Sequence, residues 1–138
     1  MPDGFRVRML TPMGEVLDAT VSYVRAPASD GLFGIMAGHA PMVADLAVGA
    51  TRVTDTDDAT RYFATTNGVV RVTDDEVLVL VEAAEEADQI DIDRAHRAFE
   101  RAQHRLASTS DAGVDISRAE LALARALNRL RVAQRAQL

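Results

Sequence analysis

The chain has 138 residues, no cysteine and a formal net charge of -6. This length allows one domain, or one domain with an appendage, and we expect the second arrangement. The absence of cysteine excludes a disulfide framework and any metal or redox site built on thiolates. The sequence shows no signal peptide and no apolar run near the roughly 20 residues of a membrane span, so we expect a soluble, cytoplasmic chain.

Charge is divided unevenly along the chain. Residues 1–87 carry 6 Arg against 14 Asp and Glu, whereas residues 88–138 carry 9 Arg against 7 acidic residues. Every basic residue is Arg, so each positive charge is a permanent planar fork. The C-terminal segment is therefore the positive end of an acidic protein. Codon bias combined with solvated helix faces explains the same pattern equally well.

Strand signals begin at the N-terminus. Alternating apolar residues over 5–10 and 16–24, separated by a Thr-Pro-Met-Gly turn, predict a β-hairpin. Residues 26–31 have the composition of a loop. The apolar run 32–42 is interrupted too often for a helix, and we expect tight extended turns there. The interrupting residues are Gly31, Gly34, Gly38 and Pro41.

Further strands follow after Gly49, separated by turns rich in Asp and Asn, including Asn67-Gly68. The last of them is almost continuously apolar, which indicates a strand buried on both faces. Short strands at this spacing predict an antiparallel β-sandwich, or flattened barrel, over residues 1–87. The expected strands are 50–54, 61–65, 69–73 and 76–82.

Catalytic and metal-binding patterns are missing from this part. His39 stands alone in a Gly-rich turn, which favours a structural or contact role over catalysis. The acidic residues 55–58 lack the ligand spacing of a calcium loop, and we interpret them as a solvated turn. We therefore expect no catalytic residue and no metal site.

Residues 88–138 carry helical periodicity in two segments. Asp88 or Asp91 caps the first helix, and Asp115, or Ser117 with Glu120, caps a second one that runs to about Arg135. A polar break at 108–113 separates them, which predicts an antiparallel helical hairpin. The expected inward residues are Ile90, Ala95, Ala98, Phe99, Ala102 and Leu106, then Ile116, Ala119, Leu123, Leu127 and Leu130.

Pairing across the hairpin predicts a cluster of arginines. If the chain turns near Asp111, residues whose numbers sum to about 222 face each other, which brings together Arg94, Arg101, Arg125 and Arg129. Converging guanidinium groups favour an anion between them, and their forks match phosphate oxygens. The alternative is that each Arg points to water. The seam is mostly alanine, so the hairpin is weakly packed and able to open.

Three motifs in the same order resemble one protein family along nearly the whole chain. They are residues 34–41 (Gly-Ile-Met-Ala-Gly-His-Ala-Pro), residues 68–72 (Gly-Val-Val-Arg-Val) and the Arg- and Ala-rich residues 118–130. In these the chain is similar to the epsilon subunit of bacterial F-type ATP synthases, which is called delta in mitochondria. Ala37 stands where the family usually has Pro.

This resemblance implies a non-catalytic subunit of the central stalk of a proton- or sodium-translocating ATP synthase, peripheral to the cytoplasmic face of the plasma membrane. Its sandwich would contact the gamma subunit and the c-ring, and its hairpin would inhibit ATP hydrolysis by reaching the alpha and beta subunits. The implied c-ring or gamma contacts are Asp30, Leu32, Met36, His39 and Met42.

Some family members bind ATP as a regulatory ligand in the folded hairpin, and residues 90–95 (Ile-Asp-Ile-Asp-Arg-Ala) resemble their motif. The implied ATP-binding residues are Glu85, Ile90, Asp91, Arg94, Ala95, Arg101, Arg125 and Arg129. Without the resemblance, the alternative is a free-standing sandwich whose Arg-rich hairpin binds an anionic partner. Only Phe99 interleaves with the arginines of the hairpin, and the chain is acidic overall, so we expect no nucleic acid.

Overall fold

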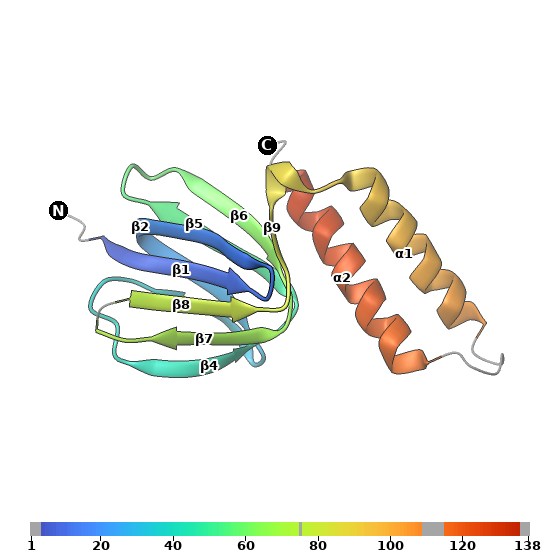
Figure 1. The fold of residues 1–138 in the computed structure, drawn as a ribbon, viewed down its shortest axis with the longest axis horizontal. Helices are drawn as coiled ribbons and strands as arrows, with labels where there is room; N and C mark the ends of the chain where they lie inside the picture. The colour runs from blue at the N-terminus through green and yellow to red at the C-terminus, as the bar shows by residue number, and fades with distance from the viewer. Residues whose placement is uncertain (1–3, 75, 109–114, 136–138) are drawn as a thin grey trace. The chain divides into compact units, whose positions relative to one another are not determined.

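The computed structural model describes residues 4–74, 76–108 and 115–135 (Figure 1). The chain divides between Glu86 and Ala87 into two compact units. The first unit is a β-sandwich and the second is a pair of helices, as the sequence predicts.

Within its described residues, the first unit contains nine strands. The longest, β2, has 15 residues and is bent by an irregularity between Val21 and Tyr23. The strands are β1 (Phe5–Thr11), β2 (Gly14–Ala28), β3 (Gly31–Ile35), β4 (Met42–Leu46), β5 (Gly49–Asp55), β6 (Thr60–Thr65), β7 (Gly68–Val72), β8 (Glu76–Val81) and β9 (Ala84–Glu86).

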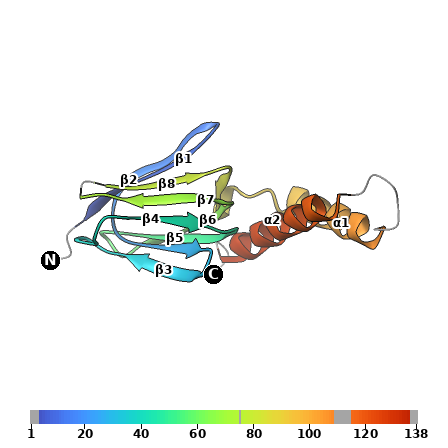
Figure 2. The ribbon, with the colours of Figure 1, turned by 90° about the horizontal axis from the view of Figure 1, so that it is seen from below.

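The strands close into a flattened barrel. Neighbouring strands run in the order β1-β8-β7-β4-β2-β5-β6-β9, β3 pairs with β2, and β1 also pairs with β2. The first half of β2 pairs with β1 and its second half with β3 and β5, so this strand passes from one layer to the other (Figure 2). The β1–β8 pairing is parallel, and the other pairings of the described strands are antiparallel.

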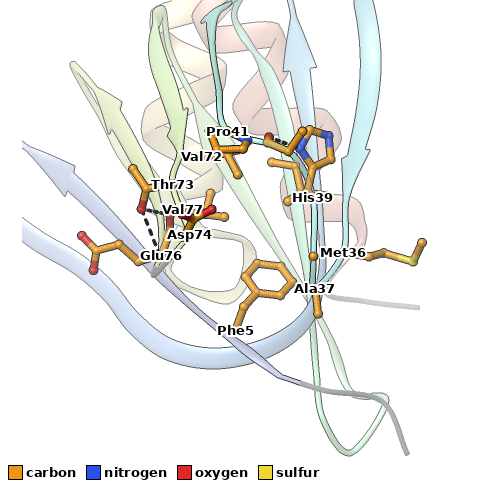
Figure 3. Close-up of a pocket in the computed structure, with 13 residues that line it drawn as sticks. Phe5, Met36, Ala37, His39, Pro41, Val72, Thr73, Asp74, Glu76 and Val77 are labelled. Atoms are coloured by element: carbon orange, nitrogen blue, oxygen red, sulfur yellow. Dashed lines mark hydrogen bonds between the residues drawn. The ribbon is translucent and has the colours of Figure 1, made fainter.

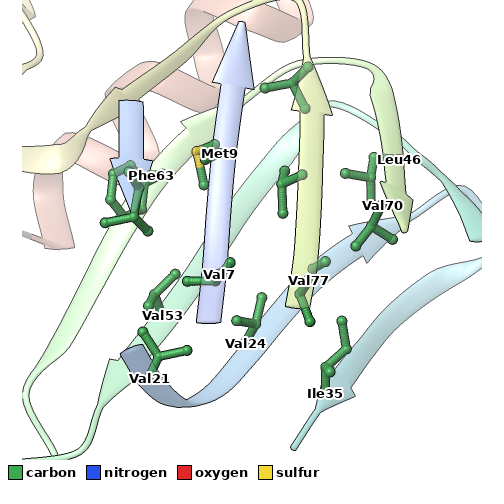
Figure 4. Close-up of a cluster of buried hydrophobic side chains, with 14 of the residues drawn as sticks. Val7, Met9, Val21, Val24, Ile35, Leu46, Val53, Phe63, Val70 and Val77 are labelled. Atoms are coloured by element: carbon green, nitrogen blue, oxygen red, sulfur yellow. The ribbon is translucent and has the colours of Figure 1, made fainter. Parts of the chain in front are cut away.

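Alternating apolar side chains fill the space between the two layers (Figure 4). Val7, Met9, Phe63 and Val79 are fully buried there. Each such side chain contributes about 1.5–3 kcal/mol through its removal from water. One polar pair lies at the same depth, because the hydroxyls of Thr51 and Thr65 are 2.8 Å apart and satisfy each other.

The second unit begins with the short 3₁₀ helix η1 (Ala87–Gln89), followed by α1 (Ile92–Ala107) and α2 (Ile116–Arg135). The Asp91 carboxylate accepts the Arg94 amide N–H at 3.0 Å, which confirms one of the two predicted caps of α1. The Asp115 carboxylate likewise accepts the Arg118 amide N–H at 3.1 Å. The two helices lie side by side and run antiparallel (Figure 1).

Alanines form the seam between these helices. Ala95 and Ala102 on α1 are buried, as are Ala119 and Ala126 on α2. The two residues of each pair lie seven positions apart, which is two turns of one helix face. Small side chains let two helices approach closely but bury little apolar area. The predicted alanine seam is therefore present.

Three expectations about the strands are wrong. Residues 26–28 continue β2 instead of forming a loop, because they pair with residues 31–33 of β3 across a tight turn. The strand β4 was not expected, since Asp45 and the preceding Gly38 and Pro41 mask its alternation. The last long strand is not buried on both faces, because Leu80 is 42% exposed.

Two expectations about the helices also need correction. Ile116, the first residue of α2, is 46% exposed and is not part of the buried seam. Val132 and Ala133 are buried although neither was expected to be. The predicted break at 108–113 lies, apart from Ser108, outside the described residues.

Candidate interaction surfaces

The connection between β3 and β4 is a tight turn built around Gly38 and His39. Gly38 has a φ of 82°, in the left-handed region that glycine adopts without strain. The His39 amide N–H donates to the Met36 carbonyl at 3.1 Å. Nδ1 of His39 lies 2.7 Å from the Ala40 carbonyl oxygen, which only accepts, so Nδ1 carries the proton. These two bonds favour a structural role for His39 in the turn, and its contact role stays a prediction.

Beneath this turn is a pocket of about 170 Å³ (Figure 3). At its edge, the Thr73 side chain makes two local hydrogen bonds. Thr73 Oγ1 donates to the Glu76 carbonyl at 3.1 Å and accepts the Glu76 amide N–H at 3.2 Å. A hydroxyl that both donates to and accepts from the same backbone segment closes a turn, which favours a structural role for Thr73. Apolar side chains line the floor, among them Phe5, Ile35, Val72 and Val77.

The predicted c-ring or gamma contacts fall into two groups. Leu32 on β3 is 62% exposed and Met36, directly after β3, is 64% exposed; Asp30 is exposed in the turn before β3. His39 is only half-exposed. Met42 packs against the core from β4, since its strand alternates in phase with the buried Leu46. The surface therefore presents Asp30, Leu32 and Met36, whereas Met42 contributes mainly to the core.

A second apolar surface lies on the outer side of β1, β8, β7 and β4. Leu80 is 42% exposed there and Val43 is 66% exposed. In register, Leu80 pairs with Leu10 on one side and with Val69 on the other. We call Leu10, Val43, Val69 and Leu80 the β8 face. Local alternation does not predict this face, because only the register of four strands shows that these side chains share one side.

Ion pairs border the β8 face on the first two strands. Arg6 binds the Asp18 carboxylate through two hydrogen bonds of 2.9 and 2.8 Å, and Arg8 binds Glu15 at 2.9 Å. The Arg6 guanidinium holds the pKa of Asp18 below its usual range. Exposed pairs of this kind contribute little stability, typically about 0–1 kcal/mol. They border the β8 face on its β1–β2 side, as polar groups at the rim of a protein interface do. Arg71 and Asp45 are exposed on the same side, paired in register with Val43 and Val69.

The predicted ATP-binding residues of the hairpin occupy different environments. Arg94 and Arg101 on α1 are exposed, whereas Arg125 and Arg129 on α2 are half-buried. Nε of Arg125 is buried and has no hydrogen-bond partner among the described residues. Ile90 and Ala95 are buried, and the Asp91 carboxylate already caps α1. Glu85 lies on β9 of the sandwich, half-buried and paired in register with Ala64.

A groove of about 460 Å³ runs between the two helices. Residues of both helices line it together. None of the predicted ATP-binding residues lines it. Convergence of the four arginines therefore stays a prediction. The groove is lined by Ile92, His96, Leu127, Leu130, Arg131 and Gln134.

Two negative observations apply to the described residues. They contain no group of three or more His, Asp or Glu side chains arranged to hold a metal ion. In the same part of the chain, neither helix is long and apolar enough to cross a membrane.

Comparison with known proteins identifies the family. Residues 4–87 match the model of the ATP synthase delta/epsilon chain β-sandwich domain, and residues 88–134 match that of the delta/epsilon chain long α-helix domain. The ATP synthase epsilon chain of Bacillus pumilus is 44% identical over 93% of this chain and 95% of its own. That of Desulfitobacterium hafniense is 38% identical over 97% of this chain and 99% of its own.

The fold is shared with a distant solved structure. A chain in the mitochondrial ATP synthase of Euglena gracilis (OSCP/F1/c-ring) superimposes with a TM-score of 0.78 at 22% identity, covering 99% of this chain and 82% of that one. At this identity the likeness concerns the fold alone. The sequence matches, which span the sandwich and the hairpin, show that the chain belongs to the ATP synthase delta/epsilon chain family.

Proposed function

We propose that this chain, a non-catalytic subunit of the F-type ATP synthase central stalk, couples the rotor to the catalytic head and restrains ATP hydrolysis through its hairpin. The observation that carries the proposal is that one chain combines two features: the exposed apolar β8 face on a sandwich with its own core, and a hairpin whose helices contact each other through alanines. The β8 face is suited to permanent docking, and the weakly packed hairpin is suited to detachment. The complex would lie at the cytoplasmic face of the plasma membrane, with the chain peripheral to it.

The β8 face is the proposed docking surface for the gamma subunit. Leu80 and Val43 expose large apolar side chains from neighbouring parts of one sheet layer, with ion pairs of Arg6 and Arg8 at its border. Exposed apolar side chains bordered by charged groups are typical of protein interfaces. The rigid barrel behind it requires little ordering on binding, which favours affinity.

The turn before β3 and the outer side of β3 are the proposed contact with the c-ring. Leu32 is exposed on β3, Met36 is exposed directly after it, and Asp30 precedes β3 in the chain. His39 stiffens the neighbouring turn through its bond to the Ala40 carbonyl. A stiff, apolar edge transmits torque better than a mobile loop, because it does not have to be ordered at each contact.

The hairpin is the proposed regulatory element. Its seam is built on Ala95, Ala102, Ala119 and Ala126, so little apolar area opposes its opening. Residues 88–138 carry an excess of Arg over acidic residues, which favours contact with acidic segments of the catalytic head. ATP would hold the folded state through Glu85, Asp91 and the four arginines, by giving the guanidinium groups a polyphosphate partner.

The proposal is tested by comparing the full-length chain with a chain that ends at residue 87, each assembled with gamma and the catalytic head. The sandwich has its own core, so the shorter chain should assemble equally well. ATP hydrolysis by the complex should rise several-fold on truncation. Assembly is checked by co-purification. Equal hydrolysis rates in two fully assembled complexes would contradict the inhibitory role of the hairpin and leave the docking role intact.

A further inference from the structure

Two arginines lie directly opposite each other on the outer side of β2 and β5. Arg25 of β2 pairs in register with Arg52 of β5. Their strand neighbours Val24 and Val53 belong to the buried core, so alternation places both guanidinium groups on the outer side. Like charges at directly opposed positions destabilise a sheet unless an opposite charge compensates them.

The positions next to this pair in register carry no charge. In register, Gly34 stands beside Arg25 and Tyr62 beside Arg52. The ion pairs of the described residues in this unit belong to Arg6, Arg8 and Arg61, and none involves Arg25 or Arg52. Residues 1–87 contain 14 acidic residues and 6 Arg, so carboxylates outnumber arginines in this segment and yet none of the described ones pairs with Arg25 or Arg52. The other outer-side positions of β2, β3, β5 and β6 are uncharged: Tyr23, Pro27, Leu32, Ala50, Thr54, Thr60 and Ala64. Glu85 of β9 stands on the same side one strand further away, paired with Ala64.

Hydrogen bonding of the pair is also incomplete. Nε of Arg25 and Nε of Arg52 are both buried, and neither has a hydrogen-bond partner among the described residues. A buried N–H of a charged group is costly when no acceptor meets it. A change of side-chain rotamer that turns the Nε edge toward an external acceptor would remove this cost.

Tyr23 defines one wall of the site. The Arg52 guanidinium carbon lies 5.4 Å from the centre of the Tyr23 ring, a cation–π distance. The ring itself occupies space above Gly34, where a Cβ atom would collide with the Tyr23 hydroxyl. The glycine thus makes room for the ring, and the ring holds the Arg52 guanidinium against the strand that carries Arg25.

We propose that the Arg25–Arg52 pair binds a tetrahedral, doubly charged oxyanion of the phosphate class. Two adjacent forks offer two positive charges and N–H donors from two directions, which match a dianion with oxygens on all sides. A carboxylate carries one charge and two coplanar oxygens, which a single fork satisfies. This site lies entirely on the sandwich and depends neither on the hairpin nor on the proposed place of the subunit in the stalk.

The test follows the arginine Nε–H signals of the ¹⁵N-labelled full-length chain by NMR during a titration with inorganic phosphate at constant ionic strength. The signals of Arg25 and Arg52 are assigned by their loss in Arg25→Gln and Arg52→Gln. Both should move downfield and saturate at millimolar phosphate, because each Nε–H gains an acceptor. Acetate at the same ionic strength should move them at least tenfold less.

Arg71→Gln is the matched control, because it removes one exposed Arg from the other layer of the sandwich. It should leave the phosphate response unchanged, whereas Arg52→Lys, which keeps the charge but loses the fork, should weaken binding at Arg25 at least fivefold. If Arg25→Gln does not fold, Arg52→Lys alone decides the outcome. Signals that do not respond to phosphate, or that respond equally to acetate, would overturn the proposal.

Discussion

At the scale of single residues, Arg94 distinguishes the two interpretations of the hairpin arginines. It is exposed on the first turn of α1, immediately after the cap formed by Asp91. If the hairpin binds ATP, Arg94→Ala should reduce the affinity at least tenfold, since a charged hydrogen bond is worth about 1.5–3 kcal/mol. Calorimetric titration of ATP into the two proteins measures this.

Arg97→Ala is the matched control for that titration. Arg97 is also exposed on α1, one turn further along, and it is not among the residues that the resemblance implies. ATP should bind this variant as it binds the unmodified chain. No heat at millimolar ATP for the unmodified chain would mean that these arginines simply point to water. An equal loss of affinity in both variants would indicate non-specific charge attraction.

Glu86 gives a prediction for acid stability. Its carboxylate accepts two hydrogen bonds from Arg61, at 2.8 and 2.7 Å, and this contact lowers the pKa of Glu86 in the folded state. A lowered pKa adds stability at pH values above the unfolded pKa of about 4.3, and this stability is lost as the pH falls through the folded pKa. Between pH 7 and pH 3, Glu86→Gln should therefore lose less stability than the unmodified chain.

Urea unfolding of the sandwich at a series of pH values measures this difference. Glu82→Gln is the control, because Glu82 is exposed and forms none of the ion pairs found among the described residues. Its stability should change with pH in parallel with the unmodified chain. Parallel curves for Glu86→Gln would show that the Arg61 contact contributes nothing measurable.

At the scale of the elements, the alanine seam sets how firmly the hairpin closes. A leucine at position 119 would place three extra carbon atoms where the helices are closest, because Ala119 is buried in α2. Overpacking of this kind costs about 1–3 kcal/mol, so Ala119→Leu should open the hairpin. Faster amide hydrogen exchange along α1 and α2 reports the opening, with no change in the sandwich.

Ala124→Leu controls for helix propensity and added apolar area. Ala124 lies on the same helix but is exposed, so a leucine there meets no facing helix. Exchange rates in this variant should stay within about twofold of the unmodified chain, since exposed substitutions usually change stability by less than 0.5 kcal/mol. Equal acceleration in both variants would show that packing at the seam does not control closure.

Most of the strands, both helices and part of the candidate sites could be predicted from the sequence. Alternation located the β1–β2 hairpin and the later strands, and helical spacing with Asp91 and Asp115 located both helices, because these signals are local. The parallel β1–β8 pairing and the β8 face could not be predicted from the sequence, since both depend on which distant strands are neighbours. The opposition of Arg25 and Arg52 depends in the same way on the register of β2 and β5.

At the scale of the whole molecule, the uneven charge predicts how the proposed inhibition responds to salt. Residues 88–138 have 9 Arg against 7 acidic residues, in a chain whose net charge is -6. If the arginines of the opened hairpin meet acidic segments of the catalytic head, the attraction acts over a Debye length, which falls from about 10 Å at 0.1 M salt to about 3 Å at 1 M. Inhibition should therefore weaken as salt rises.

The measurement is the ratio of ATP hydrolysis between complexes with the truncated and the full-length chain, from about 0.05 to 0.5 M potassium chloride, a range over which screening changes strongly. Each ratio corrects for the effect of salt on the catalytic head, because the truncated complex experiences the same salt. The ratio should fall toward one. A ratio that stays constant or rises would mean that apolar contacts, which salt does not screen, hold the hairpin in the head, and that the positive charge of residues 88–138 belongs only to solvated helix faces.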